Sequence, residues 1–327
     1  MINFNYVKST SVQNATAVLN REATAKAIAG GTNLVDLMKR GVMSPQKLVD
    51  VTALPLKEIQ RNGNVISLGA LALNSAVAEH KLVKEHLPLL SQALNAGASA
   101  QIRNMATVGG NMMQRTRCPY FYDTAMPCNK REPGTGCSAL QGYNRMHAIF
   151  GASEQCIAVH PSDMCIALAA LDASVVIAGP GGERRLPFLN FHRLPGNTPQ
   201  LDNNLQRGEL ITAVEVPVVK GLAAKSLYTK IRDRASYAFA LVSVAAALDM
   251  KGKTIQQARL AMGGVAHKPW RLTAAENFLR GKGATVANFQ QAASLAMQEA
   301  RGHGHNNFKL TMAPNTLVHT LKTVAGI

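Results

Sequence analysis

The chain has 327 residues, a formal net charge of +16 and 47% hydrophobic residues, a length and composition that predict about two domains with packed cores. Aromatic residues make up only 5% of the chain, and neither basic–aromatic interleaving nor finger spacing is visible, which argues against a nucleic-acid-binding protein. The excess of Lys and Arg therefore points to an anionic cofactor or a protein partner.

The chain starts without the pattern of a secretion signal. Residues 1–6 contain no charged region followed by an apolar core, and no apolar run approaches the ~18 residues of a membrane span. The five cysteines are odd in number, whereas disulfide frameworks belong mostly to small secreted domains. We therefore expect a soluble chain with reduced thiols that serve metal binding or catalysis.

The N-terminal segment predicts a small α/β unit in the order strand, helix, strand, helix, strand. An amphipathic helix surrounds residues 15–19 and a second helix spans 33–40, with strands over 26–29 and 47–51. The turn between the second strand and the second helix reads Ile28-Ala29-Gly30-Gly31-Thr32-Asn33-Leu34.

The glycine pair in this turn is a candidate phosphate loop. Glycine lets the backbone approach a ligand, Thr32 is a candidate helix cap, and free N–H groups at the start of a helix suit a pyrophosphate. A glycine pair before a helix is more often a plain tight turn. The motif alone leaves both interpretations open.

From residue 62 onward, hairpin turns and alternating strands predict an α+β segment. Asn62-Gly63 and the glycine-rich run 179–182 are turn signals. The expected elements are strands over 65–68, 175–178 and 211–216 and helices over 74–80 and 86–97.

Two further loops in this segment support a cofactor. Ala106-Thr107-Val108-Gly109-Gly110-Asn111 is a second glycine turn, with a hydroxyl and an amide beside it. In His160-Pro161-Ser162-Asp163, either Ser162 or Asp163 caps the following helix, or Asp163 accepts hydrogen bonds from a ribose or ribityl hydroxyl. Three such loops in one α+β domain are harder to explain as plain turns than any one of them.

Four cysteines cluster between these loops. The spacing Cys-x9-Cys-x8-Cys-x18-Cys of Cys118, Cys128, Cys137 and Cys156 does not match the short knuckles of structural zinc sites. Iron–sulfur clusters accept thiolates from long irregular loops, and the surrounding Pro and Gly residues predict such a loop. An iron–sulfur cluster therefore fits better than zinc, which stays as an alternative.

The same region is basic. These cations are candidates for offsetting the negative charge of a thiolate-bound cluster, and the alternative is that they are solvated on the loop surface. We expect some of them to do the first and some the second. Cys165 lies in an apolar helix, where cysteine behaves as a small hydrophobe, and His147 and His160 receive no role from the sequence. The basic residues are Arg103, Arg115, Arg117, Lys130, Arg131 and Arg145, against Asp123 and Glu132.

The C-terminal part predicts a separate α/β domain. Residues 195–200 resemble a loop and Gly221 follows a strand, so we place the main boundary near residue 222. A strand pair is expected over 239–249 and 259–263, followed by helices over 273–280, 284–300 and 309–325.

These residues together resemble a known family. Thr116-Arg117-Cys118-Pro119-Tyr120-Phe121, Pro127-Cys128-Asn129-Lys130-Arg131, Gly136-Cys137 and His160-Pro161-Ser162-Asp163 are similar to the FAD-binding medium subunits of periplasmic-type aldehyde oxidoreductases, within the xanthine dehydrogenase (molybdenum hydroxylase) family. Lys230-Ile231-Arg232-Asp233-Arg234-Ala235-Ser236-Tyr237 resembles the start of that family's C-terminal domain. The resemblance spans nearly the whole chain, and the cysteine loop is its most specific part.

The resemblance implies an α+β fold. Residues 1–222 would form a vanillyl-alcohol-oxidase-type (PCMH) FAD-binding domain of two α/β subdomains, 1–55 and 56–222, with the cluster loop over about 115–157. Residues 223–327 would form a C-terminal α/β domain, a small antiparallel sheet with helices like that of CO dehydrogenase flavoproteins.

The resemblance also implies the site residues. Cys118, Cys128, Cys137 and Cys156 would hold one [4Fe-4S] cluster, and Cys165 matches no ligand position. No catalytic residue is assigned to this chain, although Lys230 is a candidate for tuning the flavin. The FAD contacts would be Ala29, Gly30, Gly31, Thr32, Asn33, Leu34, Gly97, Thr107, Gly110, Asn111, Asp163, Ile211 and Lys230.

The implied function is electron transfer within an aldehyde oxidoreductase. A large partner subunit would carry the molybdenum cofactor and a small one two [2Fe-2S] clusters, in a heterotrimer that passes electrons through FAD to an external acceptor. A partner's signal would bring the complex to the periplasm, with the cytoplasm as the alternative. The rival functions are a self-contained FAD-dependent oxidase or reductase and a zinc-stabilised basic interaction module.

Overall fold

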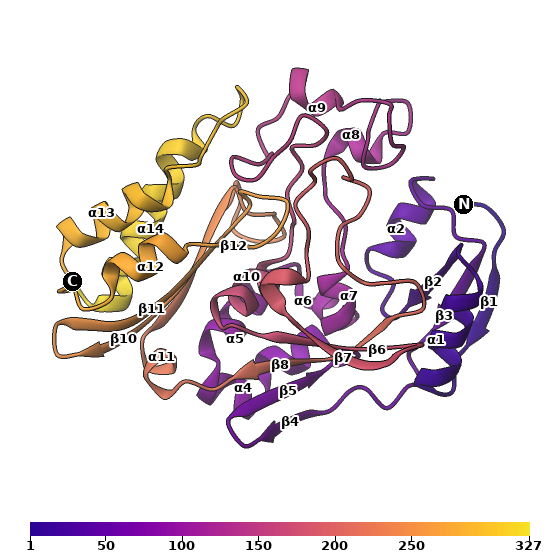
Figure 1. Cartoon of the computed structure of the whole chain (residues 1–327), viewed down its shortest axis with the longest axis horizontal. Helices are drawn as coiled ribbons and strands as arrows, with labels where there is room; N and C mark the ends of the chain where they lie inside the picture. Colours follow the sequence, from indigo (N-terminus) through magenta and orange to yellow (C-terminus); the bar gives the residue numbers. More distant parts are fainter.

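The computed structural model describes all residues, 1–327, and contains three β-sheets. Figure 1 shows the N-terminal unit at the right, a central sheet with its helices, and the C-terminal helices at the left. The loop with α8 and α9 lies at the top, above the middle of the molecule (Figure 1). No helix has the length and apolar character needed to cross a membrane.

The N-terminal unit has the predicted order of elements. Its parallel sheet, in the order β1-β3-β2, alternates in sequence with two helices. Ser11 accepts a hydrogen bond from the backbone N–H of Asn14 at 3.1 Å and so starts the first helix. The elements are β1 (Asn5–Lys8), α1 (Val12–Arg21), β2 (Ala25–Ile28), α2 (Leu34–Lys39) and β3 (Lys47–Asp50).

The central unit is a five-stranded antiparallel sheet in the order β4-β5-β8-β6-β7. Both predicted hairpins are present, because Asn62-Gly63 joins β4 to β5 and the glycine run near 180 joins β6 to β7. The strands are β4 (Ile59–Asn62), β5 (Val65–Gly69), β6 (Ser174–Gly179), β7 (Gly182–Pro187) and β8 (Leu210–Pro217).

Helices pack on this sheet and form the main core with it. Every residue of α10 is buried, which matches its lack of a polar face. The helices are α3 (Asn74–Glu79), α4 (Lys81–His86), α5 (Pro88–Ala96), α6 (Ala100–Arg103), α7 (Val108–Met112) and α10 (Asp163–Ala170).

The single helix predicted over 86–97 is wrong in its first residues. Pro88 begins α5, and the residue before a proline is driven away from helical angles. Leu87 accordingly has φ −132° and ψ 48°, and α4 ends before it.

The cysteine loop is irregular, as predicted, apart from α8 (Pro119–Tyr122) and α9 (Ser138–Gln141). An isolated antiparallel bridge places Cys128 opposite Cys137, and a second joins Ser153 to Cys156. Proline and glycine supply the turns, with Gly134 and Gly136 at φ +89° and +102°. The loop thus folds back on itself rather than extending into solvent.

The C-terminal part is an antiparallel sheet in the order β12-β11-β10-β9. Strand β9 was not predicted. The strand predicted from residue 239 starts three residues before β10 does, because Phe239 and its neighbours belong to a loop. Short connections complete the chain: the 3-10 turn Phe188–Asn190 and α11 (Lys220–Ala224). The elements are β9 (Ser226–Ile231), β10 (Val242–Lys251), β11 (Thr254–Gly263), β12 (Trp270–Arg271), α12 (Thr273–Leu279), α13 (Val286–Ala296) and α14 (Lys309–Ala325).

The two faces of this C-terminal sheet are both covered. Val244 and Leu248 pack with the helices α12 to α14, whereas Ala245 and Ala247 join the main core beside α10. This period-two alternation is what a strand buried on both faces requires. The sheet consequently presses its inner face against the segment that contains Asp163.

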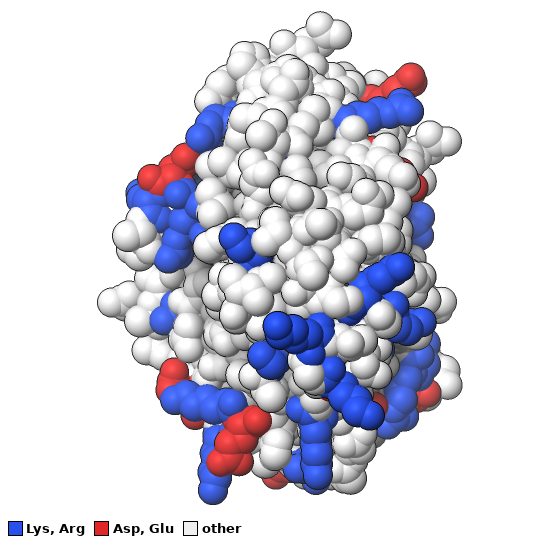
Figure 2. Space-filling model, turned by 90° about the vertical axis from the view of Figure 1, so that its left-hand side faces the viewer, with Lys and Arg blue, Asp and Glu red and all other residues white.

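The charge is unevenly distributed. Figure 2 looks at the side of the molecule that carries the C-terminal helices, and blue Lys and Arg side chains outnumber red Asp and Glu and gather in its lower half. A field of one sign over part of a surface attracts anionic partners.

Candidate functional site

The first glycine loop touches the loop that precedes the second one. A Cβ placed on Gly30 would collide with the carbonyl oxygen of Met105, so only glycine permits this contact. No backbone N–H from Gly30 to Leu34 donates to a protein acceptor. A run of free donors beside a helix start is an arrangement that anionic groups occupy.

Asn33 adds a side-chain donor to this loop. Its Oδ1 accepts from the backbone N–H of Arg115 at 2.9 Å, while its buried Nδ2 has no partner in the protein. The expectation that Thr32 caps the following helix is wrong, because Asn33 occupies the N-cap position of α2 and no side chain bonds there. Buried polar groups are usually hydrogen-bonded, so this amide is available to a ligand or an ordered water.

The second and third loops are joined by hydrogen bonds. Thr107 caps α7 by accepting from the N–H of Gly110 at 3.2 Å. Asn111 Oδ1 accepts from the Ser162 hydroxyl at 2.6 Å, and Ser162 in turn caps α10 by accepting from the N–H of Cys165 at 3.1 Å. The structure therefore brings the two loops together, and Ser162 is the capping residue of the pair that the sequence offered.

Asp163 is a buried ion-pair partner rather than a cap. Its Oδ2 lies 2.8 Å from Lys230 Nζ, and the side chain of Lys230 is 4% exposed. Tyr228 donates its hydroxyl to Asp163 Oδ1 at 2.7 Å and lies 2.9 Å from Ser243 Oγ. Burial, followed by the charge of Asp163, raises the pKa of Tyr228 well above its ordinary value, so it remains a donor.

Gly97 lies against the same carboxylate, because a Cβ there would be 3.1 Å from Asp163 Oδ2. Lys230 Nζ also donates to the carbonyl of Ala96 at 3.0 Å. Ile211 differs from the other predicted contacts: its side chain is buried in the main core on β8. Beside it, the carbonyl of Thr212 accepts from Ala70, whose carbonyl accepts from the N–H of Gly109.

The four predicted cysteine ligands line one small cavity, which Cys118, Cys128, Cys137 and Cys156 share with Thr116 and Lys130. All four are free thiols, and Cys128 and Cys156 are buried. Burial raises the pKa of Cys118 to about 12 and that of Cys156 to about 11. A cation that binds neighbouring cysteines as thiolates would offset the cost of ionising these two buried thiols.

The spacing of the four sulfurs differs from that around a single bound zinc ion. Zn–S bonds of about 2.3 Å hold tetrahedral thiolates roughly 3.8 Å apart. No three of these cysteines have sulfurs within 4.8 Å of one another. A cluster keeps its cysteines farther apart because several metal and sulfide atoms lie between them.

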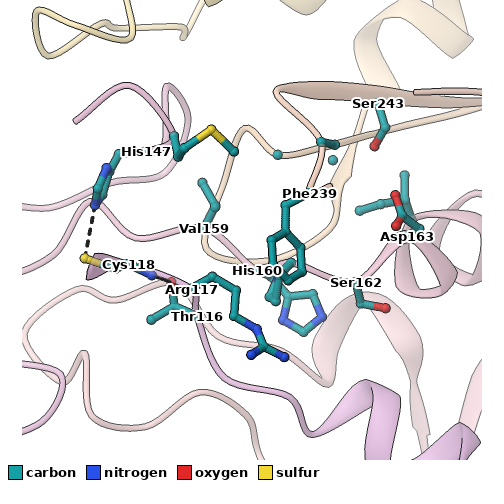
Figure 3. Close-up of a pocket in the computed structure, with 16 residues that line it drawn as sticks. Thr116, Arg117, Cys118, His147, Val159, His160, Ser162, Asp163, Phe239 and Ser243 are labelled. Atoms are coloured by element: carbon teal, nitrogen blue, oxygen red, sulfur yellow. Dashed lines mark hydrogen bonds between the residues drawn. The ribbon is translucent and has the colours of Figure 1, made fainter. Parts of the chain in front are cut away.

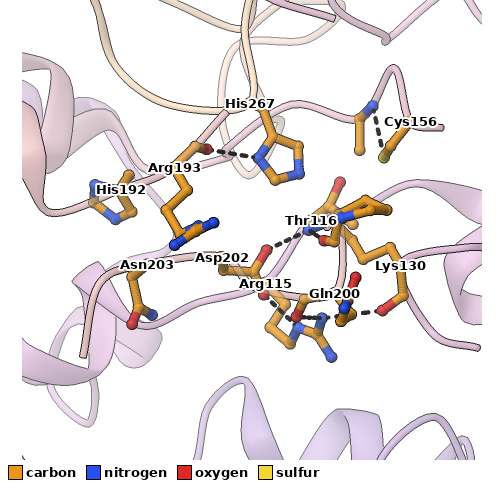
Figure 4. Close-up of polar contacts among 12 residues, drawn as sticks. Arg115, Thr116, Lys130, Cys156, His192, Arg193, Gln200, Asp202, Asn203 and His267 are labelled. Carbon is orange, nitrogen blue, oxygen red and sulfur yellow. Dashed lines mark hydrogen bonds and ion pairs between the residues drawn. The ribbon is translucent and has the colours of Figure 1, made fainter. Parts of the chain in front are cut away.

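Sequence reasoning missed a buried ionic network that anchors this cavity (Figure 4). The side chain of Lys130 is 1% exposed, pairs with Asp202 and donates to the carbonyl of Pro199 at 2.8 Å. Arg115 Nε lies 2.7 Å from the other oxygen of Asp202, and despite burial these two cations hold the pKa of that carboxyl well below its usual range. The sequence pointed to Arg115 and Lys130 only as members of a basic region, and it did not point to Asp202 at all.

A second pocket adjoins the cysteine cavity (Figure 3). Thr116 and Cys118 line both, and the second pocket extends past His147, His160 and Phe239 to Asp163 and Ser243. Cys118 is the one cysteine of the four that lines it. The cysteine cavity and the pocket that ends at Asp163 are thus neighbours that share the wall formed by Thr116 and Cys118.

Cys165 is fully buried in α10, away from the cysteine cavity, as predicted. Its sulfur lies within 4.8 Å of ring nitrogens of His160 and His192, which are both buried. His192 Nε2 donates to the carbonyl of Met112 at 3.0 Å, and burial lowers its pKa to about 4.

Two family models cover the chain. The "FAD binding domain in molybdopterin dehydrogenase" matches residues 2–219, and the "CO dehydrogenase flavoprotein C-terminal domain" matches residues 226–324. The predicted fold, a PCMH-type FAD-binding domain followed by this C-terminal domain, is confirmed.

Individual proteins agree with the family models. The chain is 47% identical over 320 residues, 97% of each chain, to the aldehyde oxidoreductase FAD-binding subunit PaoB of Escherichia coli K12. It is 31% identical to the glyceraldehyde dehydrogenase medium chain of Sulfolobus acidocaldarius, over 85% of this chain and 82% of the other. A carbon monoxide dehydrogenase structure from Hydrogenophaga pseudoflava superposes with a TM-score of 0.78 at 25% identity, over 100% of this chain and 99% of the other.

Proposed function

This chain belongs to the FAD-binding subunits of the molybdenum hydroxylase family, and from that membership we propose that it is the flavin- and iron–sulfur-containing electron-transfer subunit of an aldehyde oxidoreductase. The observation that carries this proposal is the pair of adjoining cavities, one lined by four free thiols and the other by Asp163. The relative named as an aldehyde oxidoreductase subunit supports the aldehyde class.

The residues present fit FAD. The free N–H groups from Gly30 to Leu34 and the unpaired amide of Asn33 would hold its pyrophosphate, and Thr107, Gly110 and Asn111 lie on the adjoining loop. Asp163 presents a carboxylate, already oriented by Lys230 and Tyr228, to the pocket. When bound, FAD supplies one- and two-electron redox chemistry.

The cysteine cavity fits one [4Fe-4S] cluster, which supplies one-electron transfer. Cys118, Cys128, Cys137 and Cys156 would bind it, and the buried cation of Lys130 beside them would offset the charge of the thiolates. The chain's own part in this chemistry is to bind, to orient and to exclude water. Oxidation of the aldehyde would take place on a partner subunit.

The proposal includes partners that the chain does not contain. A large subunit would carry the molybdenum cofactor and a small one two [2Fe-2S] clusters, in a heterotrimer that delivers electrons to an external acceptor. The basic face in Figure 2 is a candidate surface for one of these proteins. We also propose that the complex is periplasmic, which rests on the resemblance of the cysteine loop and is tested by subcellular fractionation.

Flavin and iron content test the proposal directly. The anaerobically purified chain should carry one FAD and about four irons, with an EPR signal on reduction. Cys156→Ser should lose the signal and most of the iron, whereas Cys165→Ser, an equally buried thiol outside the cavity, should keep both.

Three results would contradict the proposal. Zinc in place of iron would support an interaction module. Loss of the cluster in Cys165→Ser but not in Cys156→Ser would refute the ligand assignment. Reduction of the flavin by an aldehyde in the isolated chain would support a self-contained oxidase.

A further inference from the structure

His147 connects the cysteine cavity to the C-terminal domain. Its Nε2 lies 3.1 Å from the sulfur of Cys118, and both residues line the pocket that leads to Asp163 (Figure 3). A cysteine bound to iron is a thiolate, which only accepts hydrogen bonds. When the cysteine binds iron, Nε2 of His147 must therefore carry its ring proton and donate a hydrogen bond to this sulfur.

Two buried side chains of the C-terminal domain hold His147 in place. Lys309, at the start of α14, donates to the carbonyl of His147 at 2.9 Å and to that of Gly264 at 2.7 Å. Asn306 donates to the carbonyls of His147 and Ala148, at 3.2 and 2.9 Å. Both are 0% exposed.

Burying Lys309 against His147 costs desolvation free energy. Lys309 has no carboxylate within ion-pair distance, so its ammonium is buried against carbonyl oxygens only. Buried cations without a counter-charge are rare because desolvation opposes them. A lysine at this position gains a partner when a negatively charged cluster forms next to His147.

We propose that His147 is a positioning residue that raises the reduction potential of the cluster at Cys118, and that Asn306 and Lys309 hold it there. The proposal rests on the cluster assigned under the proposed function. A hydrogen bond to a ligating sulfur draws electron density from it and stabilises the reduced, more negative cluster.

Cys118 is the cysteine where such tuning matters most. It is the single ligand of the four that also lines the flavin-side pocket, so the cluster faces that pocket through the sulfur that His147 contacts.

Replacement of the donor tests the proposal. His147→Phe should make the cluster's midpoint potential more negative, reducing the ratio of reduced to oxidised cluster at a fixed potential about tenfold, or about 59 mV for a one-electron couple. His147→Gln, which keeps an N–H donor, should stay close to wild type. The readout is EPR signal intensity during a redox titration of the full chain.

His192→Phe is the matched control, because His192 is equally buried but donates to the carbonyl of Met112 instead of a cysteine. Its potential should be unchanged. Lys309→Met should shift the potential in the same direction as His147→Phe, and it decides the matter if His147→Phe fails to assemble a cluster.

An intact cluster with a wild-type potential in His147→Phe, or failing assembly in Lys309→Met, would overturn the inference. A wild-type chain without iron would refute the proposed function itself, so the two failures are distinguishable.

Discussion

Asp163, Lys230 and Tyr228 form one buried hydrogen-bonded group. Lys230, which the resemblance made a candidate for tuning the flavin, pairs with Asp163, and its side chain is 4% exposed. Tyr228, two residues earlier on the same strand, faces the same carboxylate. This pairing could not be predicted, because the three residues come from two elements, α10 and β9, that meet only in the folded chain.

Gly30→Ala tests the close approach of two loops at this scale. The new Cβ would collide with the backbone carbonyl of Met105, which cannot move without shifting its loop. We expect at least a tenfold loss of FAD affinity and about 2 kcal/mol of destabilisation, as is usual for overpacking. Flavin titration and urea unfolding of the chain measure these effects.

Gly181→Ala is the matched control, because a Cβ at Gly181 meets no atom within 4 Å and its backbone needs no left-handed conformation. It should bind FAD like the wild type. Normal FAD affinity in Gly30→Ala would show that the two loops do not form one cofactor site.

At the scale of elements, the cysteine loop owes its order to ionic anchors in its interior. Arg131 donates to the carbonyls of Tyr120 and Phe121, and Lys130 and Arg115 converge on Asp202. An irregular loop has few ladder hydrogen bonds, so side chains must satisfy its carbonyls. Three of the basic residues thus anchor the loop, a structural role that the sequence did not indicate.

Asp202→Asn should loosen this loop. It leaves Lys130 buried without a counter-charge, and breaking a buried ion pair costs about 3–5 kcal/mol. We expect faster limited proteolysis between residues 115 and 157 and a lower midpoint of urea unfolding.

The exposed pair between Arg145 and Asp233 gives the control, since the side chain of Asp233 is 58% exposed. Asp233→Asn should cost under about 1 kcal/mol, as is usual for surface pairs. Equal effects of the two substitutions would mean that the buried network does not order the loop.

At the scale of the whole molecule, burial of histidines sets the response to acid. Burial lowers the pKa of His192 from 6.5 to about 4 and that of His267 to about 3. Between those values and pH 6.5 the unfolded chain binds protons that the native chain does not, so stability is lost as the pH falls.

Lowering the pH from 7 to 5 should cost about 2 kcal/mol for each of these histidines. Urea unfolding of the flavin-free chain at the two pH values measures the loss. His192→Gln should lose less stability over the same interval than wild type, because one protonation site is removed. If the variant lost as much stability between pH 7 and pH 5 as the wild type, protonation of His192 would not contribute to the acid response.

The sequence by itself determined the kind of site and most of its parts. The glycine pairs, the Ser162-Asp163 turn and the four cysteines are signals that can be read from short stretches of sequence. Close approach of the backbone requires glycine, a helix cap requires a short polar side chain, and a thiolate ligand requires cysteine. The same local signals placed most helices and strands, since side-chain periodicity sets which face is buried.

Only the tertiary structure decided how these parts combine. The partners of Asp163, Lys130 and His147 lie far away in the sequence, on Lys230, Asp202 and Lys309. Hydrogen bonds and ion pairs form between groups that packing brings within reach, and packing of the C-terminal sheet against α10 is a property of the whole chain. For that physical reason the sequence predicted the residues of two cofactor sites, and the fold placed these two groups of residues side by side.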